Sequence, residues 1–304
     1  MTTAAPIAVF AFNRPDHLEA TLAALLRCRG ADESPIHVFA DGPRHSGEAD
    51  AVDATRRVAV DMLGDRAEFR FAEGNQGLAA SISAGVGELV ERFGRVIVVE
   101  DDLELSQEFL SYMNAALNRF EASPEILQVS GFSYEVASFS DRDEGLVFPL
   151  TTTWGWATWE RAWRRYDPEA TDWEKLISDK TLARRFNLDG AYDYTTMLKR
   201  QMRGQLDSWG IRWYWSVFRA GGLVVYPPQT LVVNRGMDGS GTHGKGLLTR
   251  FGQRESVMRD TPVDLPEEPI VDAQAWAMLK RSIWVQNGGY AGQIRNWIRS
   301  KIGR

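Results

Sequence analysis

Three consecutive carboxylic acids, Glu100-Asp101-Asp102, are the residues of this 304-residue sequence most suited to chemistry. They follow the apolar run 96–99, which is typical of a parallel strand buried on both faces. Neighbouring carboxylates at the end of a buried strand repel one another, which favours a compensating cation. Proteins commonly hold Mg²⁺ or Mn²⁺ with one or two carboxylates plus substrate phosphates. The triplet therefore predicts a metal that bridges a diphosphate, although three acids alone are also typical of a solvated loop.

The segments before the triplet alternate between strand and helix patterns. Short β-rich runs lie at 7–12 and 36–40, an amphipathic segment starts near Pro15, and helical periods follow from about residue 50 and over 77–93. This order is typical of βαβ units, so we expect an α/β, Rossmann-like fold with a mainly parallel sheet flanked by helices. Ligands bind at the carboxyl ends of the strands in such sheets, which is where the acids lie.

The second half of the sequence is less regular. Strand candidates lie at 127–129, 146–150 and 223–226, with a tryptophan-rich helical stretch between them. No linker, low-complexity tract or internal repeat separates the two halves. We therefore expect one continuous domain of two lobes.

Composition narrows the partners and the compartment. A formal net charge of −6 argues against broad nucleic-acid binding, which needs excess Lys and Arg. The single cysteine, Cys28, cannot form an intrachain disulfide. We expect a cytoplasmic protein, because neither an export signal nor a membrane-spanning run of roughly 18 apolar residues is evident. The chain is predicted to be helical from about Ala273, and its basic amphipathic end at 294–304 suits either the inner face of an anionic membrane or packing on its own domain.

A series of short motifs occurs in the order found in one enzyme family. The segment 96–103, Val-Ile-Val-Val-Glu-Asp-Asp-Leu, resembles the metal-binding motif of GT-A glycosyltransferases, in particular the α-mannosyl β-1,2-N-acetylglucosaminyltransferase family. The likeness covers roughly residues 7–245, and its further motifs are Asn13-Arg14, Asp41, Asn75-Gln76-Gly77-Leu78, Phe148-Pro149, Trp154-Gly155-Trp156, Asp207-Ser208-Trp209 and the glycine-rich run 239–244. Each motif is short, and their shared order carries the resemblance.

The resemblance implies roles for these residues. We assign the metal, Mn²⁺ or Mg²⁺, to Asp102. The residues expected to bind a nucleotide-sugar donor are Asn13, Arg14, Asp41, Asn75, Asp101 and His243. From the local pattern alone, Arg14 could also face solvent at a strand end, and Asp41 could serve only the turn that precedes Gly42-Pro43.

The acceptor side is assigned in the same way. Asp207 is the expected catalytic base, and Trp154, Trp156 and Trp209 are expected to face the acceptor, although their spacing is also typical of a core. The implied parts of the chain are a nucleotide-sugar-binding lobe at 1–126, an acceptor and catalytic lobe at 127–250, and a C-terminal helical tail at 251–304.

The implied function is the inverting transfer of N-acetylglucosamine from UDP-GlcNAc to a hydroxyl of a glycan or lipid-linked acceptor. Ser208 replaces one of the family's paired acids and Asn13 replaces its acid before arginine, so the base and the nucleotide stay open. One alternative is a nucleotidyltransferase of sugar phosphates, but those usually open with a glycine-rich loop, which 10–15 lacks. Another is a non-catalytic sugar-nucleotide-binding protein.

Overall fold

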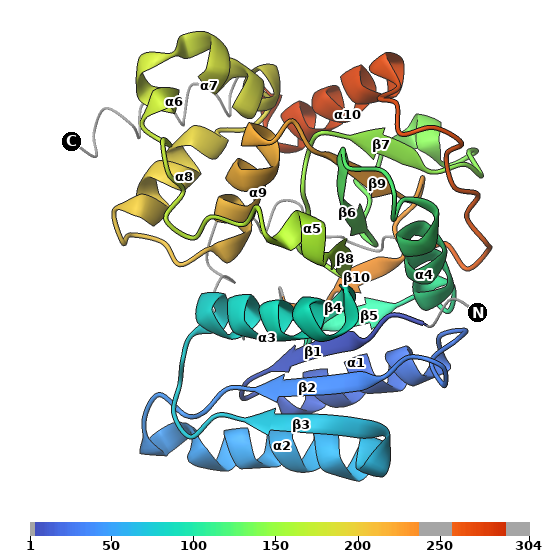
Figure 1. The fold of residues 1–304 in the computed structure, drawn as a ribbon, viewed down its shortest axis with the longest axis vertical. Helices are drawn as coiled ribbons and strands as arrows, with labels where there is room; N and C mark the ends of the chain where they lie inside the picture. The colour runs from blue at the N-terminus through green and yellow to red at the C-terminus, as the bar shows by residue number, and fades with distance from the viewer. Residues whose placement is uncertain (1–3, 237–256, 290–304) are drawn as a thin grey trace.

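The computed structural model describes residues 4–236 and 257–289 of the chain. The predicted donor residue His243 and the basic segment 294–304 lie outside the described residues, so their roles stay predictions. Over the described residues, the chain folds around one large sheet with helices on both faces (Figure 1).

The central sheet has eight strands in the order β3-β2-β1-β4-β8-β6-β9-β7. Strands β3, β2, β1 and β4 run parallel, whereas β8 runs antiparallel to both of its neighbours. Strands β5 and β10 form a separate antiparallel pair. The strands are β1 Ile7–Ala11, β2 Ile36–Ala40, β3 Ala67–Phe71, β4 Arg95–Glu100, β5 Leu103–Leu105, β6 Ile126–Ser130, β7 Leu146–Phe148, β8 Trp156–Trp159, β9 Leu223–Tyr226 and β10 Val232–Asn234.

Local sequence explains where the helices of the first half begin and end. Helix α1 starts at Pro15, whose fixed φ suits a first helical turn. Helix α3 ends before Gly94, which has a φ of 77° that favours glycine. The helices are α1 Pro15–Arg27, α2 Ala49–Leu63, α3 Leu78–Phe93, α4 Phe109–Arg119, α5 Glu160–Trp163, α6 Lys175–Ser178, α7 Lys180–Phe186, α8 Tyr194–Met202, α9 Trp209–Arg219 and α10 Ala273–Gln286.

Alternate residues of β1 face opposite layers. Ile7 and Val9 pack in a core that includes α1, α2 and α4, whereas Ala8 and Phe10 pack in a core that includes α3 and α9. Side chains of a strand alternate between the two faces of a sheet, so a strand covered on both faces is apolar throughout. This explains the continuous apolar runs of β1 and β4, whose ends position the acidic triplet.

The second half forms a third core that is rich in aromatic side chains. It gathers residues of β7, β9 and helices α6 to α10, including Phe186 and Trp215. Helix α10 contributes Leu279 and Ile283, so this part of the predicted tail packs on the domain. In the described part of the chain, no helix is both long and apolar enough to cross a membrane.

The predicted fold class, a Rossmann-like α/β domain with a mainly parallel sheet flanked by helices, is confirmed. The predicted strands 36–40 and 223–226 coincide with β2 and β9. Strand β8 was not predicted, because its residues Trp156–Trp159 lie in the stretch read as helical. Since β4 pairs with β8, one sheet crosses the predicted lobe boundary at residue 126.

Candidate active site

One cavity of about 580 Å³ opens at the carboxyl ends of β1, β2 and β4. We call its lining residues from 10–102 the N-terminal wall and those from 132–236 the C-terminal wall. Of the predicted site residues that the structure describes, all but Trp156 line this cavity, namely Asn13, Arg14, Asp41, Asn75, Asp101, Asp102, Trp154, Asp207 and Trp209. The fold therefore brings predicted donor and acceptor residues into one space.

Arg14 links the two aspartates that follow β4. Its Nη2 pairs with Oδ1 of Asp101 and, at 3.1 Å, with Oδ2 of Asp102. Asp101 is 3% exposed, and its Oδ2 also accepts from the Phe12 N–H at 3.3 Å. The Thr21 hydroxyl donates to the Asp101 carbonyl oxygen at 2.8 Å. Asp101 is therefore a buried, fixed anchor for the Arg14 guanidinium.

The acidic triplet holds more negative charge than its protein partners neutralise. Burial, followed by the charges of Asp102 and Asp101, raises the pKa of Glu100 well above its usual range. Burial also raises the pKa of Asp101 to about 6, against the opposing effect of Arg14. Both directions are expected for carboxylates that are buried beside one another. A divalent cation would relieve this repulsion, so the donor set fits the predicted metal.

Asp102, the predicted metal ligand, lines the cavity, where a cation could reach it. Its side chain is 13% exposed, and Oδ1 accepts from Asn234 Nδ2 at 3.2 Å. Gly236 packs so closely that a Cβ there would collide with the Asp102 carboxylate and lie 2.8 Å from Arg14 Nη1. Within residues 4–236 and 257–289, no group of three or more His, Cys, Asp or Glu side chains is placed to hold an ion. A metal on Asp102 would thus need ligand oxygens or water as well.

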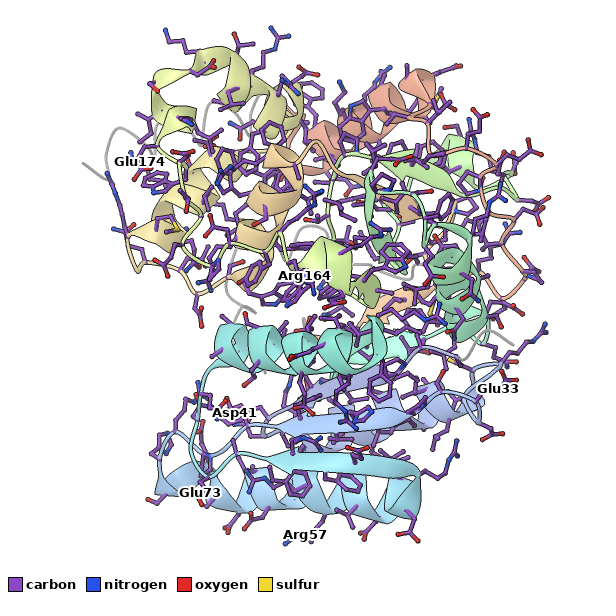
Figure 2. The ribbon with its side chains drawn as sticks, in the orientation of Figure 1. Glu33, Asp41, Arg57, Glu73, Arg164 and Glu174 are labelled. Atoms are coloured by element: carbon purple, nitrogen blue, oxygen red, sulfur yellow. The ribbon has the colours of Figure 1, made fainter. Side chains whose placement is uncertain are left out.

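Asp41 holds two loops together at the carboxyl end of β2, where Figure 2 labels it. Its Oδ1 accepts from the N–H groups of Gly42 at 2.9 Å and Gln76 at 2.8 Å, and its Oδ2 accepts from Gly77 at 3.0 Å. Asn75 Nδ2 donates to the Gly42 carbonyl oxygen at 3.1 Å. Asp41 and Asn75, both predicted to bind the nucleotide sugar, therefore hold this rim of the cavity in place through their side-chain hydrogen bonds.

Arg44 belongs to the N-terminal wall and pairs with Glu48, and both residues were missed from the sequence. Arg44 Nη2 donates to Glu48 Oε1 at 2.5 Å, and its guanidinium lies 5.0 Å from the centroid of the Phe12 ring. Asn13 Nδ2 donates to the same Oε1 at 3.4 Å. The i,i+4 spacing of arginine and glutamate could have indicated the pair, but nothing in it indicates the contact with Asn13.

Asp207 lies where the two walls meet. Its side chain is 66% exposed, and its Oδ2 lies 3.9 Å from the position that a Cβ on Gly77 would occupy. Gly77 is the N-cap of α3, whose N-terminus carries partial positive charge. Arg212 Nη2 lies 3.9 Å from Asp207 Oδ1. The carboxylate is therefore close to positive charge yet open to a ligand.

The tryptophans predicted to face the acceptor divide into two groups. Trp154 lines the cavity and meets Phe132 edge-on, with ring centroids 4.9 Å apart. Trp209 also lines the cavity, although it is only 4% exposed. Trp156 is fully buried and stacks on Trp209 at 5.2 Å, so its predicted acceptor role is wrong. The reason is its place in β8, an interior strand whose face at Trp156 is covered by α3 and α9.

Tyrosines complete the C-terminal wall, and sequence reasoning missed them too. Tyr134, Tyr192 and Tyr194 line the cavity, and Phe132 packs edge-on against Tyr134 at 5.1 Å. Burial raises the pKa of Tyr134 to about 12, so its hydroxyl stays protonated at neutral pH. Scattered tyrosines form no motif, and only the fold brings these rings together.

The chain resembles several solved structures at low sequence identity. No family model matches the chain. Solved structures that resemble it include GalNAc-T7 with UDP, GalNAc and Mn²⁺, at 9% identity and a TM-score of 0.48 over 75% of this chain and 43% of that one. Others are galactosyltransferase LgtC with donor and acceptor sugar analogs, at 14% identity and 0.41 over 93% and 96%, and mouse xyloside xylosyltransferase 1, at 10% and 0.36 over 71% and 81%.

These matches cover different shares of the known structures, and all have low sequence identity. The chain spans less than half the length of GalNAc-T7, of which 43% is covered. Identities of 14% or lower with TM-scores below 0.5 do not establish a reaction for this chain. The cavity and its residues are therefore the basis for proposing a function.

Proposed function

We propose that the chain is a metal-dependent glycosyltransferase that moves a sugar from a nucleoside diphosphate to an acceptor hydroxyl. The observation that supports this proposal is the cavity in which the Arg14–Asp102 pair and the Asp207 carboxylate occur together. A guanidinium beside a metal-holding carboxylate suits a diphosphate, and an exposed carboxylate suits a hydroxyl that must lose its proton. The volume also lies within the range of roughly 300–1,000 Å³ that is usual for ligand sites.

In this proposal the N-terminal wall binds the donor. Arg14 would donate to diphosphate oxygens, and Asp102 would hold Mn²⁺ or Mg²⁺. The cation would neutralise charge on the nucleoside diphosphate as it leaves. The rim formed by Asp41 and Asn75 would border the nucleotide, because both line the cavity beside Arg14.

The C-terminal wall would bind the acceptor. The acceptor oxygen forms a bond to the anomeric carbon while the bond from that carbon to the diphosphate oxygen breaks, and Asp207 takes the acceptor proton. A single displacement of this kind inverts the anomeric configuration. Trp154 and Tyr134 would pack against the acceptor sugar, since both line the cavity and offer aromatic surface.

The finer form of the proposal is UDP-GlcNAc as donor and a glycan or lipid-linked hydroxyl as acceptor. It depends on the resemblance of 96–103 and on the further motifs that occur before and after it in the order of the family. Asn13 stands where the family has an acid, and its amide reaches Glu48 at 3.4 Å. The choice of nucleotide is therefore the first part of the proposal to measure.

Thermal unfolding with a panel of nucleoside diphosphates and their sugars, each with and without Mn²⁺, tests the proposal. A ligand at 100 times its Kd stabilises the native state by about 2.7 kcal/mol, which raises Tm by roughly 4 °C in a chain of this size. We expect a metal-dependent rise with one nucleotide, lost in Asp102→Asn and kept in Asp207→Asn. No rise with any nucleotide would refute the donor site.

Turnover separates the remaining alternatives. We expect release of nucleoside diphosphate from the sugar nucleotide that gives the rise, faster with a suitable acceptor. Binding without any turnover would favour a non-catalytic sugar-nucleotide-binding protein. Release of pyrophosphate from a nucleoside triphosphate and a sugar phosphate would favour a nucleotidyltransferase instead.

A further inference from the structure

One nitrogen of Arg14 serves two carboxylates. Its Nη2 pairs with Oδ1 of Asp101 and with Oδ2 of Asp102, the second at 3.1 Å. A guanidinium does not lose its proton in proteins, so its positive charge persists at any pH the fold tolerates. A divalent cation on the same Asp102 oxygen would be repelled by this charge at close range. Arg14 and the metal therefore compete for Asp102.

The two aspartates hold Arg14 unequally. Asp101 is 5% exposed at its side chain, and its second oxygen already accepts from the Phe12 N–H. The Asp101 backbone is fixed as well, because Thr21 donates to its carbonyl oxygen and accepts from the Leu103 N–H at 3.1 Å. Asp102 is more exposed, at 13%, and among residues 4–236 and 257–289 its other oxygen accepts from one neutral group, the Asn234 amide at 3.2 Å. The Asp102 contact is the one that a cation from the cavity can replace.

The backbone at Gly236 closes one side of the Arg14–Asp102 pair. Gly236 lies against both partners, since a Cβ there would collide with the Asp102 carboxylate and lie 2.8 Å from Arg14 Nη1. Arg14 itself lines the cavity with 20% of its side chain exposed. Displacement from Asp102 would therefore turn the released N–H towards the cavity.

We propose that Arg14 is the internal counter-ion of Asp102 in the metal-free chain, and that a divalent cation displaces it from Asp102 while Asp101 retains it. This inference rests on the proposed metal and diphosphate site and adds a binding order to it. The metal alone binds weakly because it must separate an ion pair. A diphosphate gives the displaced N–H a new acceptor, so metal and diphosphate strengthen each other's binding by the same factor.

The test is the affinity for Mn²⁺ alone, followed by the electron paramagnetic resonance signal of the free ion, and then the affinity for UDP at saturating Mn²⁺. UDP is the probe because it carries the diphosphate without a transferable sugar. In Arg14→Gln we expect Mn²⁺ alone to bind about fivefold tighter or more, and UDP with Mn²⁺ to bind about tenfold weaker. Opposite signs are expected because the variant loses a competitor for the metal and a donor for the diphosphate.

Three further variants control for charge and folding. Arg44→Gln removes a cation from the same cavity that pairs with Glu48, so it measures the general effect of one lost positive charge on Mn²⁺ affinity. Arg14→Lys keeps the charge and should keep Mn²⁺ alone weakly bound. Arg14→Gln combined with Asp101→Asn removes a neutral pair, leaves no unpaired buried acid at Asp101, and should still bind Mn²⁺ alone more tightly than the original chain.

The outcomes separate this inference from the function on which it rests. If Mn²⁺ alone binds Arg14→Gln no more tightly than it binds Arg44→Gln, or binds the double variant no more tightly than the original chain, the counter-ion role is overturned. The metal site survives that result if Asp102→Asn still abolishes Mn²⁺-dependent UDP binding. If the original chain shows no Mn²⁺-dependent binding of any nucleotide, the proposed function fails instead.

Discussion

The N-terminal wall uses its carboxylates to organise the protein, whereas the C-terminal wall leaves its carboxylate open. Asp41 and Asp101 are 8% and 3% exposed and accept hydrogen bonds from backbone groups or Arg14. Asp207, the one carboxylate among the described lining residues of the C-terminal wall, is 66% exposed. The difference indicates that the first wall is rigid before a ligand arrives and that the second keeps a group free for chemistry.

The origin of this difference lies in the elements behind each wall. Loops after parallel strands contain backbone N–H groups that no strand pairs, and buried polar groups need partners. The Asp41 carboxylate accepts hydrogen bonds from three such N–H groups, those of Gly42, Gln76 and Gly77. The C-terminal wall is instead supported by stacked rings such as Trp156 on Trp209. Substitutions in the two walls should therefore act through different forces.

The largest effect on stability is expected for Trp156→Ala, which removes a fully buried ring from beneath the C-terminal wall. Truncation of a buried tryptophan costs about 3–5 kcal/mol of the free energy of unfolding, because the cavity it leaves collapses only in part. Trp154→Ala is the matched control, since that ring is partly exposed and should cost about 1–2 kcal/mol. Urea unfolding measures both, and equal losses would contradict the assignment of Trp156 to the core.

A smaller loss is expected for Asp41→Ala. The carboxylate accepts from three backbone N–H groups, and hydrogen bonds to a charged group contribute roughly 1.5–3 kcal/mol each when buried. Water can reach part of this rim, so we expect a total loss of about 2 kcal/mol in urea unfolding. The same variant should weaken nucleotide binding. Unchanged stability would mean that Asp41 serves the ligand rather than the loops.

The fold could be predicted from the sequence to the extent that its strands are buried on both faces. Strands β1 and β4 are built on continuous apolar runs, β2 is apolar except for His37, and all three were identified. The edge strand β3 carries Glu68 and Arg70 among its five residues, so it lacks that signal. Strand β8 consists of Trp156–Trp159 between the core of α3 and the core of α4, and its tryptophans suit a helix as well as a strand.

Residues that line the cavity could be predicted where a short motif marks them. The acidic triplet, Arg14, Asp41 and Asp207 were singled out from such motifs, and the structure places them around one cavity, while their roles stay predictions. The sequence could not show which of these side chains form ion pairs with one another. Nothing in the spacing of Arg14 and Asp102 indicates that one guanidinium nitrogen contacts two acids, because 88 residues separate them and only the parallel pairing of β1 with β4 brings them together.

A moderate, pH-dependent effect is expected at His37, which lies on β2, the strand that leads to Asp41. The ring is 1% exposed, and burial lowers its pKa, opposed by Glu68 and reinforced by Arg92 and Arg70. The folded chain takes up this proton at a lower pH than the unfolded chain, whose histidine titrates near pH 6.5, so stability is complete above that pH and falls as the pH drops below it.

Urea unfolding at pH 7 and pH 5 tests this expectation with His37→Gln. The original chain should lose more stability than the variant over this interval, because only the original chain has a buried histidine whose pKa is lowered by folding. Glu68 does not obscure the result, because hydrogen bonds from Arg92 and Arg70 lower its pKa to about 2 and keep it ionised in the fold. If the free energy of unfolding falls equally in the two proteins, the buried His37 does not cause the pH dependence.

The smallest effect on stability, and the sharpest contrast with Asp41, is expected for Asp207→Asn. The side chain is 66% exposed and its nearest cation, Arg212, lies 3.9 Å away, so the free energy of unfolding should change by less than about 0.5 kcal/mol. Turnover should nevertheless fall by roughly 10²–10⁴-fold, the usual contribution of a general base, while metal-dependent nucleotide binding is kept.

Ser208→Ala is the matched variant, because Ser208 stands where the family has its second acid. It should leave turnover within a few-fold of the original. If Ser208→Ala is the more damaging change, Asp207 is not the base. The proposed donor site is unaffected by that result, because the described structure shows no hydrogen bond or ion pair from Asp207 or Ser208 to Arg14, Asp101 or Asp102.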